Sequence, residues 1–129
     1  MSSLRWSILI TVLVEAVAME KLIIAVAPTG SVPRKKDTPC VPVTPDEIAE
    51  TAYSCEQAGA SVIHVHCRDQ NENPTSDYHT FKETVEKIRK RAHLIIMVST
   101  SGVAAKSDEE RAQPLNTNPE MASLTRERT

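Results

Sequence analysis

Three segments rich in apolar and β-branched residues, separated by stretches with helical patterns, constrain the fold of this 129-residue chain most strongly. They occupy residues 22–27, 61–67 and 94–98, and each is followed by a loop. Nearly continuous apolar runs are typical of strands buried on both faces, as in a parallel sheet. A fourth strand is expected to begin at residues 121–124. The strand centres lie about 30 to 40 residues apart, the size of successive βαβ units.

The segment between the first two strands carries clear helix signals. Residues 44–47 (Thr-Pro-Asp-Glu) form a capping box with proline in the first turn, which predicts a helix start. Ile48, Ala52 and Cys55 follow at the spacing of an apolar helix face, so Cys55 is expected to be a small core residue. Gly59 is expected to end this helix.

The next two intervening segments also predict helices. The second helix has an apolar face, and Glu83 and Lys87 on its polar side are spaced for an ion pair. The apolar face consists of Tyr78, Phe81, Val85 and Ile88. Ser107 begins a further capping box, for a short helix that Pro114 is expected to end.

Strands that alternate with helices predict an α/β protein, either a doubly wound sheet or a (β/α)8 TIM barrel. No glycine-rich nucleotide-binding motif follows any of the strands, which favours the barrel. A complete barrel takes about 250 residues, and this chain has 129. We therefore expect a partial barrel over residues 19–129, comprising about the first three to four βα units of a longer protein.

Residues 1–18 are interpreted as an apolar extension ahead of this domain. The run at 6–14 is too short to span a bilayer, which requires about 20 apolar residues. It resembles a secretory signal, but Glu15 lies between the run and the Ala-x-Ala at 16–18. Met19 offers a second start of translation.

The composition excludes several partners. Lys and Arg (15) nearly balance Asp and Glu (17), and only 3% of residues are aromatic, so neither a basic nucleic-acid surface nor a base-stacking platform is expected. No membrane partner is expected. The odd number of cysteines, 3 without a CxxC motif, argues against a disulfide framework and fits a reduced, cytoplasmic protein.

His64 and His66 are the most informative side chains. Residues i and i+2 of a strand point to the same face, so both imidazoles are expected side by side at the carboxyl end of the second strand. Active sites of α/β barrels assemble at that end. Two imidazoles there can occupy two positions of a tetrahedral metal site. The alternative is that one is hydrogen-bonded and the other solvated. Cys67 has the opposite parity and is not expected to be a ligand.

Other polar residues at the strand ends allow two interpretations each. Arg68 is expected either to bind an anionic substrate or to form a salt bridge with Asp69. The hydroxyls and amides at 99–102 hold a carboxylate or an oxyanion, or simply form a turn. The basic cluster at 34–36 is a solvated loop or binds a phosphate or a coenzyme A nucleotide. His79 and His93 are expected on the surface.

Several segments, taken in order, resemble the β-keto acid cleavage enzymes, which include the 3-keto-5-aminohexanoate cleavage enzyme. The resemblance spans Met19 to about Thr125 and is carried by residues 19–30, 43–49, 58–66, 98–102, 107–111 and 119–124. It implies a (β/α)8 barrel with a divalent metal, usually zinc. It also implies an acyl exchange in which a β-keto acid and acetyl-CoA give acetoacetate and a new acyl-CoA.

By the same resemblance, His64 and His66 are metal ligands, and Ser99, Gly102 and Ser123 contact the substrate. The partners implied are small molecules, and the parent enzyme is expected to be a homo-oligomer. Two departures from the family pattern are visible. Ser101 stands where the family usually has glycine, and the chain stops before the acidic third ligand and the arginine and aspartate that complete the site.

The resemblance implies that a member acting on an aminated substrate could use a carboxylate just after residues 29–30; Val32 stands there, so an aminated substrate is not expected. The expected function is that of an amino-terminal fragment, inactive alone. Two alternatives remain open: a non-catalytic βα module whose exposed sheet edge pairs with another chain, and a fragment of a different metal-dependent barrel aldolase. Such an aldolase would share the His-x-His motif with this chain but not the other matching segments.

Overall fold

The computed structural model describes residues 21–103 and 105–124. The extension at 1–18 lies outside the described residues. In chain order the elements are β1 (Ala25–Val26), α2 (Pro45–Gln57), β2 (Val62–Val65), β3 (Cys67–Arg68), β4 (Pro74–Thr75), α3 (Tyr78–Arg91), β5 (Ile95–Val98), α4 (Asp108–Ala112), the 3-10 helix η1 (Gln113–Thr117) and β6 (Met121–Ala122).

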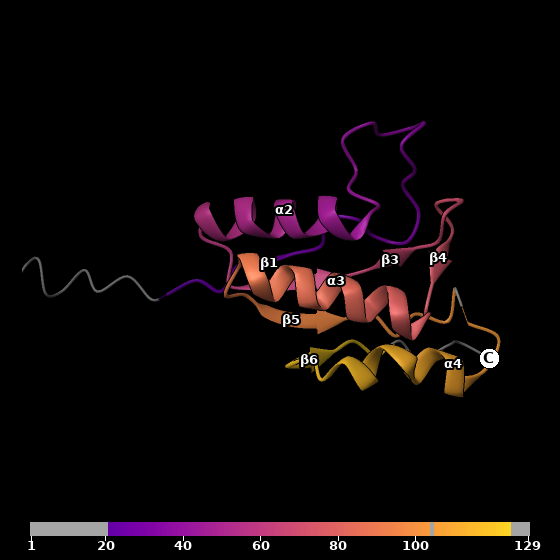
Figure 1. The fold of residues 1–129 in the computed structure, drawn as a ribbon. Helices are drawn as coiled ribbons and strands as arrows, with labels where there is room; N and C mark the ends of the chain where they lie inside the picture. Colours follow the sequence, from indigo (N-terminus) through magenta and orange to yellow (C-terminus); the bar gives the residue numbers. More distant parts are fainter. Residues whose placement is uncertain (1–20, 104, 125–129) are drawn as a thin grey trace, which may run out of the picture.

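A four-stranded parallel sheet organises the domain, in the order β1-β2-β5-β6 (Figure 1). The register pairs Ala25 with Val62, and Val62 with Ile95. Met97 pairs with Met121. Each step along the sheet is made through a helical segment, first α2, then α3, then α4 with η1. The predicted α/β class, the parallel strands and the fourth strand are confirmed.

The first two strands differ from their predicted bounds. Pairing of the first strand begins at Ile24, whose carbonyl accepts hydrogen bonds from the amides of Ser61 (2.9 Å) and Val62 (3.2 Å). The preceding Leu22 and Ile23 are exposed. The second predicted strand is interrupted at His66, because the chain then leaves the parallel sheet and forms the antiparallel β3–β4 hairpin.

The core lies between the sheet and the two long helices, which cover the same face (Figure 1). Ile48 and Ala52 of α2 are buried, as their helical spacing predicted, whereas Cys55 is only half-buried. The fully buried apolar residues of α3 are Phe81, Val85 and Ile88. From the sheet, Ile63 and Ile96 contribute, and both are fully buried.

The predicted helix ends are also observed. Thr44 and Glu47 form the reciprocal capping box of α2. Gly59 follows the last turn with φ +101°, a conformation that glycine adopts without strain. Ser107 accepts a hydrogen bond from the Glu110 amide at the start of α4. The α-helix ends at Ala112, and the chain continues as η1.

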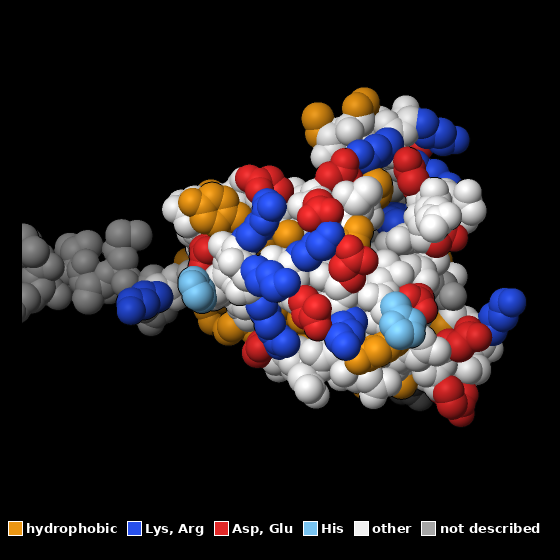
Figure 2. Space-filling view, in the orientation of Figure 1, with side chains coloured by type: hydrophobic (Ala, Val, Ile, Leu, Met, Phe, Trp, Pro, Cys, Tyr) orange, Lys and Arg blue, Asp and Glu red, His pale blue; other side chains and the backbone are white. Residues whose placement is uncertain are grey.

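The outer face of the two long helices is polar and close to charge-balanced. Figure 2 shows Lys and Arg side chains interleaved with Asp and Glu over this face. Lys87 bridges the helices, with its Nζ 2.7 Å from Asp46 and 2.8 Å from Glu83. The predicted pair between Glu83 and Lys87 is therefore confirmed. Among residues 21–103 and 105–124, no helix is both long and apolar enough to cross a bilayer.

Candidate functional site

His64 and His66 lie side by side at the carboxyl end of β2. Ile63 and Val65 point into the helix-covered core, so the intervening His64 side chain points to the opposite face of the sheet. The two imidazole rings stack, with centroids 4.7 Å apart and planes inclined by 18°. The expected juxtaposition on one face is thus observed.

Both imidazoles favour the neutral form. Burial lowers the pKa of His64. Burial, followed by the nearby positive charges of His64 and Arg68, lowers the pKa of His66 to about 4. The His64 Nε2 atom is buried and has no hydrogen-bond partner within the described part of the chain. Neutral imidazole is the form that binds a metal ion, so both rings can donate a nitrogen lone pair near neutral pH.

The loop after β5 brings hydroxyl groups close to the histidines. Ser99 is buried, and its amide donates to the Val65 carbonyl (3.0 Å). The Ser99 hydroxyl accepts a hydrogen bond from the Ser101 amide (3.3 Å). His66, Ser99 and Ser101 line one small pocket, together with Ser31. The structure therefore brings two of the predicted site residues to a common surface.

Ser123 follows β6 and is tied to the same loop. Its amide donates to the Val98 carbonyl (3.1 Å), and its hydroxyl accepts from the Thr100 amide (3.4 Å). Thr100 also donates its own hydroxyl hydrogen to the Ser123 carbonyl. Gly102 is half-buried, and its carbonyl accepts from the Ala105 amide (3.4 Å). Ser101, rather than Gly102, lines the pocket beside His66.

Arg68 has neither of its two predicted roles, which were binding an anionic substrate and forming a salt bridge with Asp69. It is 4% exposed, and its guanidinium donates to the backbone carbonyls of Gly30 (2.9 Å), Pro33 (3.1 Å) and Glu72 (3.1 Å). Asp69 instead accepts from the amides of the hairpin turn. Because the terminal guanidinium nitrogens are directed at carbonyl oxygens, Arg68 joins the loops that follow β1 and β3. It neither pairs with Asp69 nor presents these nitrogens to an anion.

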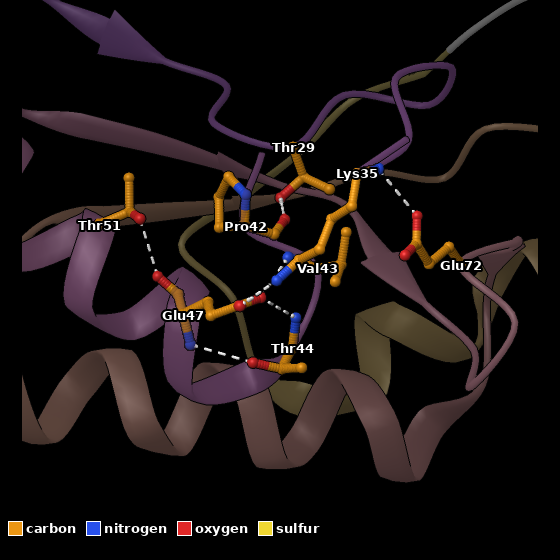
Figure 3. A network of polar contacts seen from close by, with 8 residues as sticks. All are labelled: Thr29, Lys35, Pro42, Val43, Thr44, Glu47, Thr51 and Glu72. Atoms are coloured by element: carbon orange, nitrogen blue, oxygen red, sulfur yellow. Dashed lines mark hydrogen bonds and ion pairs between the residues drawn. The ribbon is translucent and has the colours of Figure 1, made fainter. Parts of the chain in front are cut away.

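The basic cluster at 34–36 is also held by internal contacts. Arg34 donates to the Asn71 carbonyl (3.2 Å) and to Oδ1 of Asn73 (2.8 Å). Lys35 forms an ion pair with Glu47, and its amide donates to the Glu72 carboxylate (2.9 Å), as Figure 3 shows. Arg34 and Lys35 are half-exposed, and their side chains make hydrogen bonds and an ion pair within the chain.

Glu47 is the centre of the network in Figure 3. Its carboxylate accepts from Lys35 and from the amides of Val43 (2.9 Å) and Thr44 (3.0 Å). The hydrogen bond from Lys35, supported by the two amides, lowers the pKa of Glu47 to about 2. The loop thus closes over the start of α2. It borders a cleft of about 690 Å³ lined by residues including Lys35, Thr44, Arg68 and Asp77.

The other predicted non-ligands are placed as expected. Cys67 is buried, its Sγ lies 3.4 Å from the Thr84 hydroxyl, and burial raises its pKa to about 12. His79 and His93 are exposed. No cluster of three or more His, Cys, Asp or Glu side chains suited to a metal occurs in residues 21–103 and 105–124. Within the described residues, His64 and His66 are two imidazoles that stack against each other.

Sequence reasoning missed the contacts that Arg68 makes across the loops. Two of its three partners, Gly30 and Pro33, lie 38 and 35 residues earlier in the chain, and no local pattern encodes these contacts. A weak signal was present, because the first apolar run ends in Pro-Thr-Gly at 28–30, and glycine is expected where a backbone turns sharply. The φ of +63° at Gly30 confirms this turn.

Comparison with known proteins identifies the family. The sequence model of beta-keto acid cleavage enzyme (BKACE) matches residues 21–128. The chain belongs to the beta-keto acid cleavage enzyme family. The members described below are enzymes, and the predicted resemblance is confirmed.

Two relatives illustrate the range of the family. The 3-keto-5-aminohexanoate cleavage enzyme of Fusobacterium nucleatum is 45% identical over 107 residues, which is 82% of this chain and 39% of the relative. The 3-oxoadipate:acetyl-CoA acetyltransferase of Cupriavidus necator is 42% identical over 102 residues, 79% of this chain and 36% of the relative. The chain thus spans less than two fifths of the length of these curated BKACE relatives.

A solved structure supports the fold. The ternary complex of ObcA with a C4-CoA adduct and oxalate superposes with a TM-score of 0.56 at 24% sequence identity. The match covers 67% of this chain and 23% of that chain. At this level of identity the similarity concerns the fold, an α/β arrangement with a parallel sheet.

Proposed function

We propose that this chain is the amino-terminal part of a metal-dependent β-keto acid cleavage enzyme. The parent enzyme converts a β-keto acid and acetyl-CoA into acetoacetate and a new acyl-CoA. The stacked pair of neutral imidazoles at the carboxyl end of β2, beside Ser99, is the observation that carries this proposal. The names of the relatives support it, since they include a keto-acid cleavage enzyme and an acetyl-CoA acetyltransferase.

The proposed architecture is a partial (β/α)8 TIM barrel over residues 19–129. Four parallel strands in the order β1-β2-β5-β6, each joined to the next through a helical segment, are what the first units of such a barrel require. The helices cover one face, and the histidines point to the other, which would be the barrel interior. The remaining strands would then belong to a part of the parent enzyme beyond this chain.

His64 and His66 are proposed as two ligands of a divalent metal, with zinc as the best candidate. Two features fit this assignment: the lowered pKa of both rings and the buried, unpartnered Nε2 of His64. A third ligand would come from outside the described residues. A divalent ion bound there would polarise the keto oxygen and stabilise an enolate.

The substrate is proposed to contact the loops after β5 and β6. Ser99, Gly102 and Ser123 would bind its carboxylate, since hydroxyl and amide donors are concentrated there. Ser101 also lines the pocket beside His66 and would reduce the space for substrate compared with glycine. By the resemblance to the family, the uncharged Val32 stands where a carboxylate could hold a substrate amino group, which favours a substrate without one. We place the parent enzyme in the cytoplasm, as a homo-oligomer.

Zinc titration of the 129-residue chain tests the ligand assignment. We expect weak binding, reduced about tenfold or more by His64→Asn and by His66→Asn, because each removes one of two nitrogen ligands. His79→Asn and His93→Asn are matched controls, since both histidines are exposed, and they should leave the affinity unchanged. Equal affinities for all four variants would contradict the assignment.

An exchange assay tests the fragment assignment separately. Given acetyl-CoA and a β-keto acid, the chain alone should produce no acetoacetate, because the acidic ligand and the arginine expected in the family are not supplied. Metal-dependent turnover by this chain alone would show that the described residues form a complete site. The proposal that the chain is an incomplete part of the enzyme would then be wrong.

A further inference from the structure

The loop after β5 is held from two sides by residues that lie later in the chain. On one side, the Thr100 amide donates to the Ser123 hydroxyl (3.4 Å), and the Thr100 hydroxyl donates to the Ser123 carbonyl. On the other side, Nε of Arg111 donates to the Thr100 carbonyl (3.2 Å). Thr100 is buried, and the Arg111 side chain is only 17% exposed. The loop thus has one anchor just after β6 and another on α4.

Arg111 fixes the direction of the peptide group that joins Thr100 to Ser101. This peptide bond is trans, and a planar trans peptide directs its C=O and its N–H in opposite directions. Because the guanidinium holds the Thr100 carbonyl, the Ser101 N–H points away from Arg111. It donates there to the Ser99 hydroxyl oxygen (3.3 Å). The Arg111 side chain therefore sets the orientation of a donor on the opposite side of the peptide.

The same contact orients the Ser99 hydroxyl. Its oxygen accepts from the Ser101 amide, which leaves the hydroxyl hydrogen free to donate. The Ser101 hydroxyl accepts in the same way from the Val103 amide (3.3 Å). Ser99 and Ser101 line the pocket beside His66. Two hydroxyl groups are thereby arranged to donate into this pocket, a polarity that suits a carboxylate or an oxyanion.

We infer that Arg111 is a positioning residue for the candidate site. It acts on the Ser99 hydroxyl through the Thr100 carbonyl and the Ser101 amide. Its positive charge also polarises the peptide group and strengthens the Ser101 N–H as a donor. The inference rests on the proposed function in one respect, that Ser99 contacts the substrate carboxylate. The anchoring contacts themselves need neither metal nor substrate.

Without the guanidinium, the peptide between Thr100 and Ser101 loses its anchor while its neighbours keep theirs. The Ser99 amide still donates to the Val65 carbonyl (3.0 Å), and the Thr100 amide still donates to Ser123. Rotation of this one peptide would turn the Thr100 carbonyl oxygen towards the pocket and replace a donor by an acceptor. The loss of Arg111 should therefore weaken carboxylate binding without unfolding the loop.

Amide hydrogen exchange, measured by NMR on the 129-residue chain without metal, tests the contact. In Arg111→Met the Ser101 amide should exchange at least about fivefold faster, because one hydrogen bond is lost. The amides of Ser99 and Thr100 should keep their rates. Lys106→Met is the matched control, since it removes one positive charge from an exposed side chain just before α4, and it should change none of the three rates.

Two exchange patterns would overturn the inference. Equal acceleration of all three amides in Arg111→Met would mean that Arg111 merely stabilises the loop as a whole. An unchanged Ser101 rate would mean that the guanidinium does not orient this peptide.

A second measurement on the unmodified chain covers the case in which circular dichroism shows that Arg111→Met does not fold. The Nε hydrogen of Arg111 should exchange at least about fivefold more slowly than that of Arg91, whose side chain is 47% exposed. Comparable rates for the two arginines would overturn the inference.

Binding of acetoacetate separates this inference from the proposed function. The zinc-loaded Arg111→Met chain should bind acetoacetate about tenfold more weakly than the unmodified chain, because one oriented donor is lost, and its zinc affinity should be unchanged. An unaltered acetoacetate affinity would overturn the inference. If the unmodified chain binds no acetoacetate but shows the expected exchange pattern, the proposed substrate contact of Ser99 is wrong and the positioning of the peptide by Arg111 is confirmed.

Discussion

Arg68 donates a hydrogen bond to the carbonyl oxygen of Gly30, 2.9 Å away and 38 residues earlier in the chain. The contact joins the loops that leave β1 and β3 at the same end of the sheet as His66. Gly30 has φ +63°, so its carbonyl is presented by a turn that few other residues adopt. The guanidinium thus fixes the start of the 30–43 loop through Gly30 and Pro33.

Replacing this guanidinium should destabilise the fold. Arg68→Met should lower the free energy of unfolding by about 3 kcal/mol, because three carbonyl oxygens lose their donor and a buried one costs about 1–3 kcal/mol. Urea denaturation measures the change. Arg34→Met is the control, since its hydrogen bonds are exposed, and it should cost less than about 1 kcal/mol. If Arg68→Met and Arg34→Met lowered the free energy of unfolding equally, the buried hydrogen bonds of Arg68 would contribute no more to stability than the exposed ones of Arg34.

The ion pair between Lys35 and Glu47 predicts a pH dependence of stability. Glu47 has a pKa of about 2 in the folded chain, against an ordinary value of 4.5, because Lys35 and two amides stabilise its charged form. The unfolded chain therefore binds the proton first as the pH falls. The stability from Glu47 is fully present above about pH 4.5 and is lost between pH 4.5 and 2.

Glu47→Gln removes this charge and tests the assignment. The variant should be less stable than the original chain at pH 6, and the difference should shrink towards pH 2, as measured by urea denaturation at each pH. Asp37→Asn is a suitable control, as Asp37 lies on the same loop and is exposed. A difference for Glu47→Gln that stays constant from pH 6 to 2 would assign its effect to packing instead.

The three cysteines should differ in reactivity. Cys40 is exposed, whereas Cys67 is buried with a pKa raised to about 12, so Cys67 has almost no thiolate near neutral pH. Alkylation followed by mass spectrometry should modify Cys40 at least about 100-fold faster than Cys67. Comparable rates in the folded chain would contradict the burial of Cys67 in the core between the sheet and the helices.

Local signals made much of the fold predictable. The capping box at Thr44 and the apolar spacing of Phe81, Val85 and Ile88 depend on residues within a few positions of one another, and the structure confirms them. Parity within one strand likewise placed His64 and His66 together. These features are encoded by the period of the local backbone and require no knowledge of distant partners.

The remaining features depend on distant contacts and could not be predicted. The β3–β4 hairpin forms where the chain leaves the parallel sheet after His66. Residues 61–67 read as one continuous strand in the sequence, so the break at His66 was not predicted. The basic loop was expected to face solvent or a phosphate, and Arg68 to bind an anion or Asp69, but Arg34, Lys35 and Arg68 all contact groups more than ten residues away. Long polar side chains reach many partners, and only the folded arrangement selects among them.

The proposed function depends above all on His64 and His66 binding one divalent cation together. X-ray absorption at the zinc edge of the zinc-loaded chain tests it most directly, because it measures the distance and type of the ligand atoms. We expect two imidazole nitrogens at about 2.0–2.1 Å, and the loss of this signal in His64→Asn and His66→Asn. A spectrum that is unchanged in these variants, or that shows sulfur at about 2.3 Å, would contradict it.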